Sequence, residues 1–259
     1  MNVTERRERL IEILTVPDPT EGLWAVCDSG EVDEIVPELS ALRLEQDPIH
    51  RHKDVLAHTI AVTAKTRPDL QIRLAALFHD IGKPATRSFE HGGVTFRHHE
   101  AVGAKITKAR LRALEFEQPL VKNVAELVRL SGRFKGFADG WSDSAVRRYA
   151  RDGGPILGDL NELVRCDCTT RNKQKVARIQ HHVDKLEERI IELARQDRIA
   201  AERPQMDGKA VMDYLGLPPG PMVGKATAFL LELKRSEGVL DDGEVLRRLD
   251  AWWAKESGE

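Results

Sequence analysis

Apolar residues recur every three or four positions along most of the chain, and strict alternation of apolar and polar residues is almost absent. The first spacing is typical of amphipathic helices and the second of half-buried strands, so the pattern predicts an all-α protein. One exception surrounds Glu90-His91-Gly92-Gly93, which has the composition of a turn between two short extended pieces. We therefore expect a helical bundle with one small β-hairpin.

Proline, glycine and capping residues set the ends of the expected helices. The first is expected from Thr4 to Leu14, capped by Thr4, with Arg7 where a capping box would have glutamate. Further helices are expected over residues 31–42 with an interruption, 54–65, 71–81, 99–114, 120–130, 142–151, 156–170, 173–196, 229–237 and 244–255. The helix at 173–196 carries one narrow apolar seam, which fits packing within the chain or, alternatively, a dimer seam. The chain is expected to be a monomer or a homodimer.

The helix at 71–81 is apolar on both faces, which predicts that it is buried, and His79 and Asp80 stand near its end. Burying an ionised carboxylate is costly unless a partner or a metal compensates its charge. Taken alone, His79-Asp80 could be a hydrogen-bonded pair. A divalent metal is the other partner, and imidazole with carboxylate suits Mn, Co, Ni, Zn or Fe, and Mg less well.

Two further side chains complete a candidate ligand set. His58 lies on the preceding helix, and Asp167 lies in the apolar stretch 163–168. A bundle could bring His58, His79, Asp80 and Asp167 together from three helices. Four protein ligands leave positions on a six-coordinate ion open for water and substrate, as catalysis requires.

Four stretches carry a family resemblance: residues 51–59 (RHKDVLAHT), 76–86 (ALFHDIGKPAT), 96–104 (FRHHEAVGA) and 165–173 (RCDCTTRNK). The candidate ligand set resembles that of the HD-type metal-dependent phosphohydrolases. The stretches together resemble the C-terminal neck, HD and tail part of actinobacterial CCA-adding tRNA nucleotidyltransferases, and residues 215–221 fit the tail of that family. The resemblance implies an HD-domain helical bundle with helical N-terminal and C-terminal extensions.

The resemblance also implies a division of the chain. It predicts a helical neck-like region over residues 1–50, an HD domain over 51–172 and a helical body- or tail-like region over 173–259. The Gly-Ser and Asp-x-Asp motifs of the family's nucleotidyltransferase head do not occur in this sequence. We therefore expect that this chain does not add CCA, and that it is a free-standing relative or part of a longer protein.

A second departure concerns the number of metal ions. Where the family usually has a His-Leu-Arg-Phe stretch, this sequence has Ser131-Gly132-Arg133-Phe134. Di-metal HD enzymes use further histidines between the His-Asp pair and the last Asp; His99 keeps one such position and Ser131 loses the other. We expect one divalent ion rather than two. Adjacent His98 and His99 cannot share a helical face, and the resemblance favours His99 as the inward one.

The remaining polar residues near the motifs receive expected roles. Lys83 is expected to hold a phosphate as a point charge and Arg133 to bind it bidentately, and both are expected to be accessible. His99 is expected to be a general acid or a weak second-metal ligand. Arg51 and His52 are expected to contact the nucleotide or its phosphate. The alternative for each is an ordinary surface side chain.

Charge is uneven in a chain whose formal net charge is only −2. Lys and Arg gather in residues 129–151 and 165–178, which suggests a polyanionic partner or, alternatively, two solvated helix surfaces. Cys27, Cys166 and Cys168 are too few for a disulfide framework and are expected to be reduced. The chain has no apolar run of about 20 residues and no signal-peptide core, so a cytoplasmic protein without a membrane partner is expected.

The main functional expectation is a hydrolase. An ion-activated water would attack a phosphomonoester or a 2′,3′-cyclic phosphate of a nucleotide or an RNA 3′ end, with Asp80 holding the ion and orienting the water. Lys83 and Arg133 would neutralise charge on the phosphoryl oxygens. One alternative is a tRNA-binding module without catalysis, although the four ligand positions are intact. An HD-type oxygenase is less well supported, because it needs two irons and Ser131 is not such a ligand.

Overall fold

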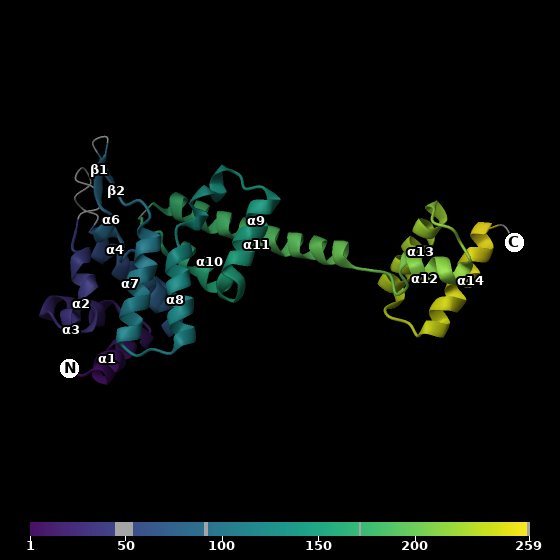
Figure 1. Ribbon diagram of the computed structural model, residues 1–259. Coiled ribbons are helices and arrows are strands. Elements are labelled where there is room, and N and C mark those ends of the chain that lie inside the picture. The colour runs from purple at the N-terminus through teal and green to yellow at the C-terminus, as the bar shows by residue number, and fades with distance from the viewer. Residues whose placement is uncertain (45–53, 91–92, 171, 258–259) are drawn as a thin grey trace. The chain divides into compact units, whose positions relative to one another are not determined.

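The computed structural model describes residues 1–44, 54–90, 93–170 and 172–257, which form two compact units, Met1–Ile191 and Glu192–Glu259. The prediction of an all-α protein with one small hairpin is confirmed: helices dominate both units, and the only sheet among the described residues has two strands (Figure 1). No helix in the described part of the chain is long and apolar enough to cross a membrane.

The N-terminal part of the first unit consists of α1 (Val3–Thr15), α2 (Thr20–Ser29), α3 (Val32–Ile35) and the 3-10 helix η1 (Pro37–Leu42). The expected cap of α1 was wrong. Asn2 is the cap, and its side chain and that of Glu5 form a complete capping box. The sequence reading also missed α2, which starts after Pro19 without any side-chain cap.

The central helices of this unit are α4 (Val55–Lys65), α5 (Leu70–Phe78), α7 (His99–Ala113), α8 (Gln118–Leu130) and α10 (Leu157–Cys166). α5 packs against α4 and α8, and α7 lies along α8 (Figure 1). Between α5 and α7 come the short helix α6 (Lys83–Thr86) and the antiparallel strands β1 (Ser88–Glu90) and β2 (Gly93–Thr95). Glu90 pairs with Gly93 at the end of the two strands, and residues 91–92 of the expected turn lie outside the described part.

The α5 helix is the centre of the core, as its apolar sequence predicted. Every residue from Ile72 to Phe78 is buried, including Arg73, whose burial was not predicted from the sequence. The Arg73 guanidinium donates to the carbonyl oxygens of Leu14 at 2.6 Å and Pro17 at 2.8 Å. This buried side chain therefore fastens α5 to the end of α1.

The remaining elements of the first unit are η2 (Arg133–Asp139), α9 (Asp143–Gly153), η3 (Gly154–Ile156) and most of α11 (Lys173–Ala201). Val183 and Leu186 of the α11 seam are fully buried, which fits packing within the chain. The division between the two compact units lies inside α11, and the expected division at residues 50 and 172 stays a prediction.

The second unit contains α12 (Gly208–Leu215), α13 (Pro221–Glu237) and α14 (Asp242–Ser257). Its small core includes Val211, Leu230 and Leu249, and the rings of Phe229 and Trp252 stack with centroids 5.4 Å apart. The helix expected at 229–237 begins earlier, because Pro221 occupies its first turn, where proline is favoured.

All three cysteines of the protein are free, as predicted.

Candidate metal centre

Three helix ends supply the four expected ligand side chains. His58 lies one turn into α4, whose N-terminus is capped by the Asp54 side chain. The α5 helix ends at Phe78 rather than at 81, so that His79 and Asp80 lie in the turn that leads to α6. Asp167 directly follows the last residue of α10. Helix C-termini carry partial negative charge, so two carboxylates placed after α5 and α10 form a site that favours a cation.

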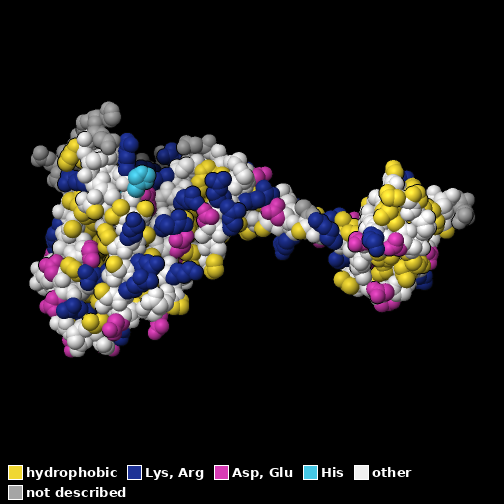
Figure 2. Space-filling model, in the orientation of Figure 1, with side chains coloured by type: hydrophobic (Ala, Val, Ile, Leu, Met, Phe, Trp, Pro, Cys, Tyr) yellow, Lys and Arg dark blue, Asp and Glu magenta, His cyan; other side chains and the backbone are white. Residues whose placement is uncertain are grey.

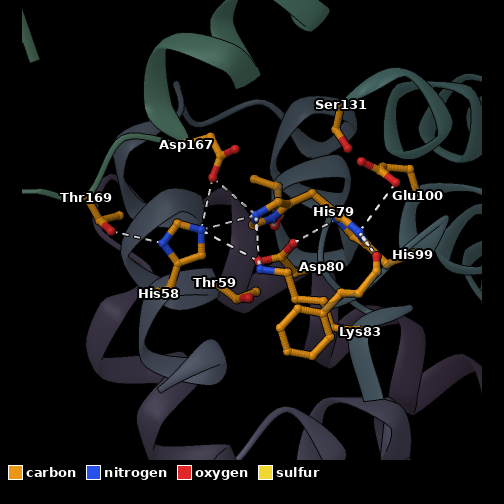
Figure 3. Close-up of polar contacts among 12 residues, drawn as sticks. His58, Thr59, His79, Asp80, Lys83, His99, Glu100, Ser131, Asp167 and Thr169 are labelled. Atoms are coloured by element: carbon orange, nitrogen blue, oxygen red, sulfur yellow. Dashed lines mark hydrogen bonds and ion pairs between the residues drawn. The ribbon is translucent and has the colours of Figure 1, made fainter. Parts of the chain in front are cut away.

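The potential ligand atoms lie close together (Figure 3). Nε2 of His58 is 3.3 Å from Nε2 of His79 and 2.9 Å from Oδ1 of Asp167. Oδ2 of Asp80 is 3.2 Å from Nε2 of His79 and 3.7 Å from Nε2 of His58. His58, His79 and Asp167 each offer one ligand atom, and these three atoms lie within 4.8 Å of one another. Two imidazoles and two carboxylates that share so small a space form a donor set that suits a divalent transition metal.

The other nitrogen of each imidazole is already engaged. Nδ1 of His79 lies 2.7 Å from the carbonyl oxygen of Ala76, which can only accept, so this Nδ1 carries a proton and donates. Nδ1 of His58 lies 2.9 Å from the hydroxyl of Thr169. Such bonds fix the ring orientation in protein metal sites and leave Nε2 for the ion. The donor set therefore fits a metal in orientation as well as in composition.

The electrostatics of the centre also favour a cation. Burial alone would raise the pKa of Asp80, but His79, Lys83 and His58 outweigh burial and hold that pKa far below its usual range. The pKa of Asp167 is likewise held low against burial, by hydrogen bonds from His58 and His79. Burial lowers the pKa of His79, yet the carboxylates of Asp80 and Asp167 outweigh it and raise that pKa to about 10. Both carboxylates are therefore ionised near neutral pH, and an ion would compete with a proton on the imidazole.

Lys83 and His99 both face Asp80, Lys83 at Oδ2 and His99 at Oδ1 of its carboxylate. The Lys83 ammonium donates to Oδ2 of Asp80 at 2.7 Å, and its side chain is only 13% exposed although it lines the pocket. His99 is buried with its Nε2 3.5 Å from Oδ1 of Asp80, and its Nδ1 donates to the carbonyl oxygen of Phe96 at 2.8 Å. Burial lowers the pKa of His99. His98 is exposed, so His99 is the inward histidine of the pair, as predicted.

The other expected phosphate contacts are not assembled at the centre. The Arg133 guanidinium forms an ion pair with Asp152 and does not line the pocket. Arg51 and His52 lie outside the described residues. Lys135, two residues after Arg133, lines the pocket instead, together with Ser131, whose hydroxyl donates to the carbonyl of Val128 at 2.9 Å.

Two cavities meet at this centre. One of about 200 Å³ holds the candidate ligands, and one of about 560 Å³ adjoins it. Both are lined by Ser131, Lys135 and Asp167. The larger cavity is also lined by Phe134 of η2 and by His182 of α11, which the sequence reading had assigned to the surface. The sequence does not indicate that α11 lies beside the HD motifs, because the apolar periodicity of α11 shows only which of its faces is buried.

Lys and Arg side chains gather on one face of this unit, over α8 and α9 (Figure 2). Within the basic segment 129–151 three cations are paired with acids: Arg129 with Glu126, Arg133 with Asp152, and Lys135 with Glu100. Others, including Arg148 and Arg151, are exposed. The basic segment at 129–151 is therefore partly an ion-paired surface.

A family model described as the HD domain matches residues 55–202, more than half of the chain, and the chain therefore belongs to the HD-domain family. It is 31% identical, over 97% of its length, to the A-adding tRNA nucleotidyltransferase of Deinococcus radiodurans. It is 33% identical, over 95% of its length, to the CC-adding tRNA nucleotidyltransferase of Thermus thermophilus. The chain spans only 58% and 56% of these two relatives. The resemblance to the HD-containing part of tRNA nucleotidyltransferases is thereby confirmed.

Proposed function

We propose that this protein is a metal-dependent phosphohydrolase that acts on the phosphate of a nucleotide or of an RNA end. The observation that carries the proposal is the convergence of His58, His79, Asp80 and Asp167 from three helix ends, with both Nε2 atoms directed at the two carboxylates. Membership of the HD-domain family supports the same class of chemistry. The names of the relatives, which act on tRNA, support a nucleotide or RNA substrate.

A divalent ion held by these four residues would supply Lewis-acid polarisation of the phosphoryl group and would lower the pKa of a water molecule. The side chains around it would do the rest. Lys135, whose side chain is 70% exposed at the edge of the pocket, would neutralise charge that develops on the phosphoryl oxygens. His99 presents Nε2 to the pocket, because its Nδ1 proton is donated to Phe96. Its Nε2 would accept a proton during attack, a role that differs from the general acid expected from the sequence. Lys83 would hold Asp80 in place.

The test is a substrate panel with a matched pair of variants. Protein purified without chelator is expected to carry about one equivalent of metal. It is expected to hydrolyse at least one member of a panel of nucleoside monophosphates, 2′,3′-cyclic nucleotides, pyrophosphates and phosphorylated RNA ends, assayed with Mg, Mn, Co and Ni. Asp80→Ala is expected to lose both metal and hydrolysis, whereas Asp28→Ala, at an exposed acid paired with Arg43, keeps both.

Full metal content in Asp80→Ala would place the ion elsewhere. A metal-loaded parent protein that hydrolyses no member of the panel would contradict the proposal. The binding module would then be the better reading, supported by the Lys and Arg side chains over α8 and α9. Equilibrium binding of tRNA at several salt concentrations would measure that alternative directly, because contacts to phosphates weaken steeply as salt increases.

A further inference from the structure

The 560 Å³ cavity beside the metal centre has no part in the metal chemistry described above. Its volume falls within the range of about 300–1,000 Å³ that is typical of small-molecule sites. It meets the metal pocket at Ser131, Lys135 and Asp167, so a molecule that fills it reaches the ion site without crossing the core. A substrate with its phosphate at the ion would therefore extend naturally into this space.

One wall of this cavity carries a supported aromatic ring. Phe134 is half-buried and stacks on Phe137, with ring centroids 5.5 Å apart and an interplanar angle of 27°. Phe137 in turn meets Trp141 edge-on at 5.4 Å and lies 6.5 Å from the His182 ring. A ring held from behind in this way has little freedom to lose on binding. Nucleobases of any identity stack on flat aromatic surfaces of this kind.

The polar groups of the cavity suit a nucleoside phosphate. Arg178 and His182 lie four residues apart on α11, and therefore on one face of that helix. Among the described residues Arg178 has neither a hydrogen-bond nor an ion-pair partner, whereas Arg165 of α10 and Arg189 of α11 are each paired with an acid. Lys135 stands where the two cavities meet, and its ammonium lies 3.4 Å from Oε1 of Glu100. Of the described residues that line the cavity, Asp167 alone is acidic, and its Oδ1 is directed at His58.

We propose that this cavity binds the nucleoside part of the substrate, an inference that rests on the proposed phosphohydrolase function. The base lies on Phe134, Arg178 and His182 contact the ribose and the polar base edge, and Lys135 contacts the phosphate at the entrance to the metal pocket. The ligand class is a nucleoside phosphate, either as a free mononucleotide or as the terminal nucleotide of an RNA.

Adenosine tests the subsite independently of catalysis, because it has no phosphate to bind the ion or to be hydrolysed. Adenosine is expected to bind the full-length chain in an NMR titration and to inhibit AMP hydrolysis competitively. Phe134→Ala is expected to weaken adenosine binding and to raise KM for AMP by about tenfold or more, in line with the loss of one stacked base, with little change in kcat. Phe134→Trp is expected to restore binding, which separates loss of stacking from misfolding.

Two cation variants refine the test. Arg178→Ala is expected to weaken both adenosine and AMP, whereas Lys135→Ala weakens AMP and leaves adenosine unchanged. The matched control is Lys185→Ala, which removes a surface cation from the same helix and leaves both affinities at the parent value. A trinucleotide with a 3′-terminal phosphate that displaces adenosine assigns the subsite to RNA ends, and displacement by AMP alone assigns it to mononucleotides.

The outcomes keep this proposal separate from the proposed function. If the protein hydrolyses nucleotides but adenosine does not bind, or binds Phe134→Ala as it binds the parent, the subsite is wrong and the hydrolase stands. If adenosine binds in a Phe134-dependent manner while no phosphate ester is cleaved, the subsite stands and the hydrolase is wrong.

Discussion

Lys83 and Lys135 are two lysines of the metal pocket in very different surroundings. Lys83 is 13% exposed and donates to the Asp80 carboxylate, whereas Lys135 is 70% exposed at the pocket edge. A buried carboxylate that loses its partner keeps its desolvation cost, while an exposed lysine has little effect on folding. Substitution of Lys83 should therefore affect mainly the stability of the fold, and substitution of Lys135 mainly catalysis.

We predict that Lys83→Met, which keeps the length of the side chain, lowers the free energy of unfolding of the metal-free protein by about 1–3 kcal/mol. Lys135→Met is expected to change it by less than about 0.5 kcal/mol but to lower kcat on the best substrate by about 100-fold. Urea denaturation and steady-state kinetics measure the two effects. Equal stability of the two variants would show that Lys83 is not the folding partner of Asp80.

At the residue scale, the sequence predicted which acids and histidines would lie in apolar surroundings but not which cations would face them. His79, Asp80 and Asp167 stand out because charged groups there need compensation. Arg133 and Lys135 lie in a short 3-10 helix without apolar periodicity, so nothing in the sequence indicated that Arg133 would pair with Asp152 while Lys135 lines the pocket.

At the element scale, the contact between the turn after α5 and the start of α7 sets the place of His99. A Cβ atom on Gly82 would lie 2.1 Å from the carbonyl oxygen of His99 and 2.6 Å from the backbone nitrogen of Gly103. Both neighbours are backbone atoms, so no side-chain rotation relieves the clash. Glycine at this position lets α7 approach closely enough for His99 to face Asp80.

We predict that Gly82→Ala lowers the free energy of unfolding by about 1–3 kcal/mol through overpacking and displaces His99 from Asp80. Gly158→Ala is the control, because a Cβ there meets nothing within 4 Å in α10 and alanine is the better helix former. Thermal denaturation and the NMR shift of the His99 ring measure the two effects. Unchanged values in Gly82→Ala would mean that the backbone there yields without cost.

Helix type and order were largely predictable, because amphipathic spacing is strong over most of the chain, but helix ends were not. α1 starts at Val3, after the cap Asn2, because a capping box needs only one suitable pair, and the Asn2–Glu5 pair precedes the expected one. α2 was not predicted, because it starts directly after Pro19 and has no side-chain cap to indicate its first residue. α5 ends before His79, and this early end is what places His79 and Asp80 in a turn facing His58.

At the scale of the whole molecule, the four candidate ligands all belong to the unit Met1–Ile191 and come from α4, from the end of α5 and from the end of α10. These positions are far apart in the sequence, so an ion bound to them would cross-link the unit. A ligand that binds only the folded state stabilises it, by about 2.7 kcal/mol at 100 times Kd. The unit Glu192–Glu259 has its own small core and contributes no candidate ligand.

We therefore predict that Mn or Co slows hydrogen exchange in α4, α5 and α10 and leaves α12, α13 and α14 unchanged. Hydrogen-exchange mass spectrometry with and without the ion measures both units in one experiment, and EDTA is expected to reverse the effect. Asp80→Ala should show no response to the ion in any helix, because it lacks a ligand. Equal protection of α13 would mean either that the ion binds outside the proposed centre or that the two units unfold together. If Asp80→Ala still shows this protection of α13, the ion binds outside the proposed centre.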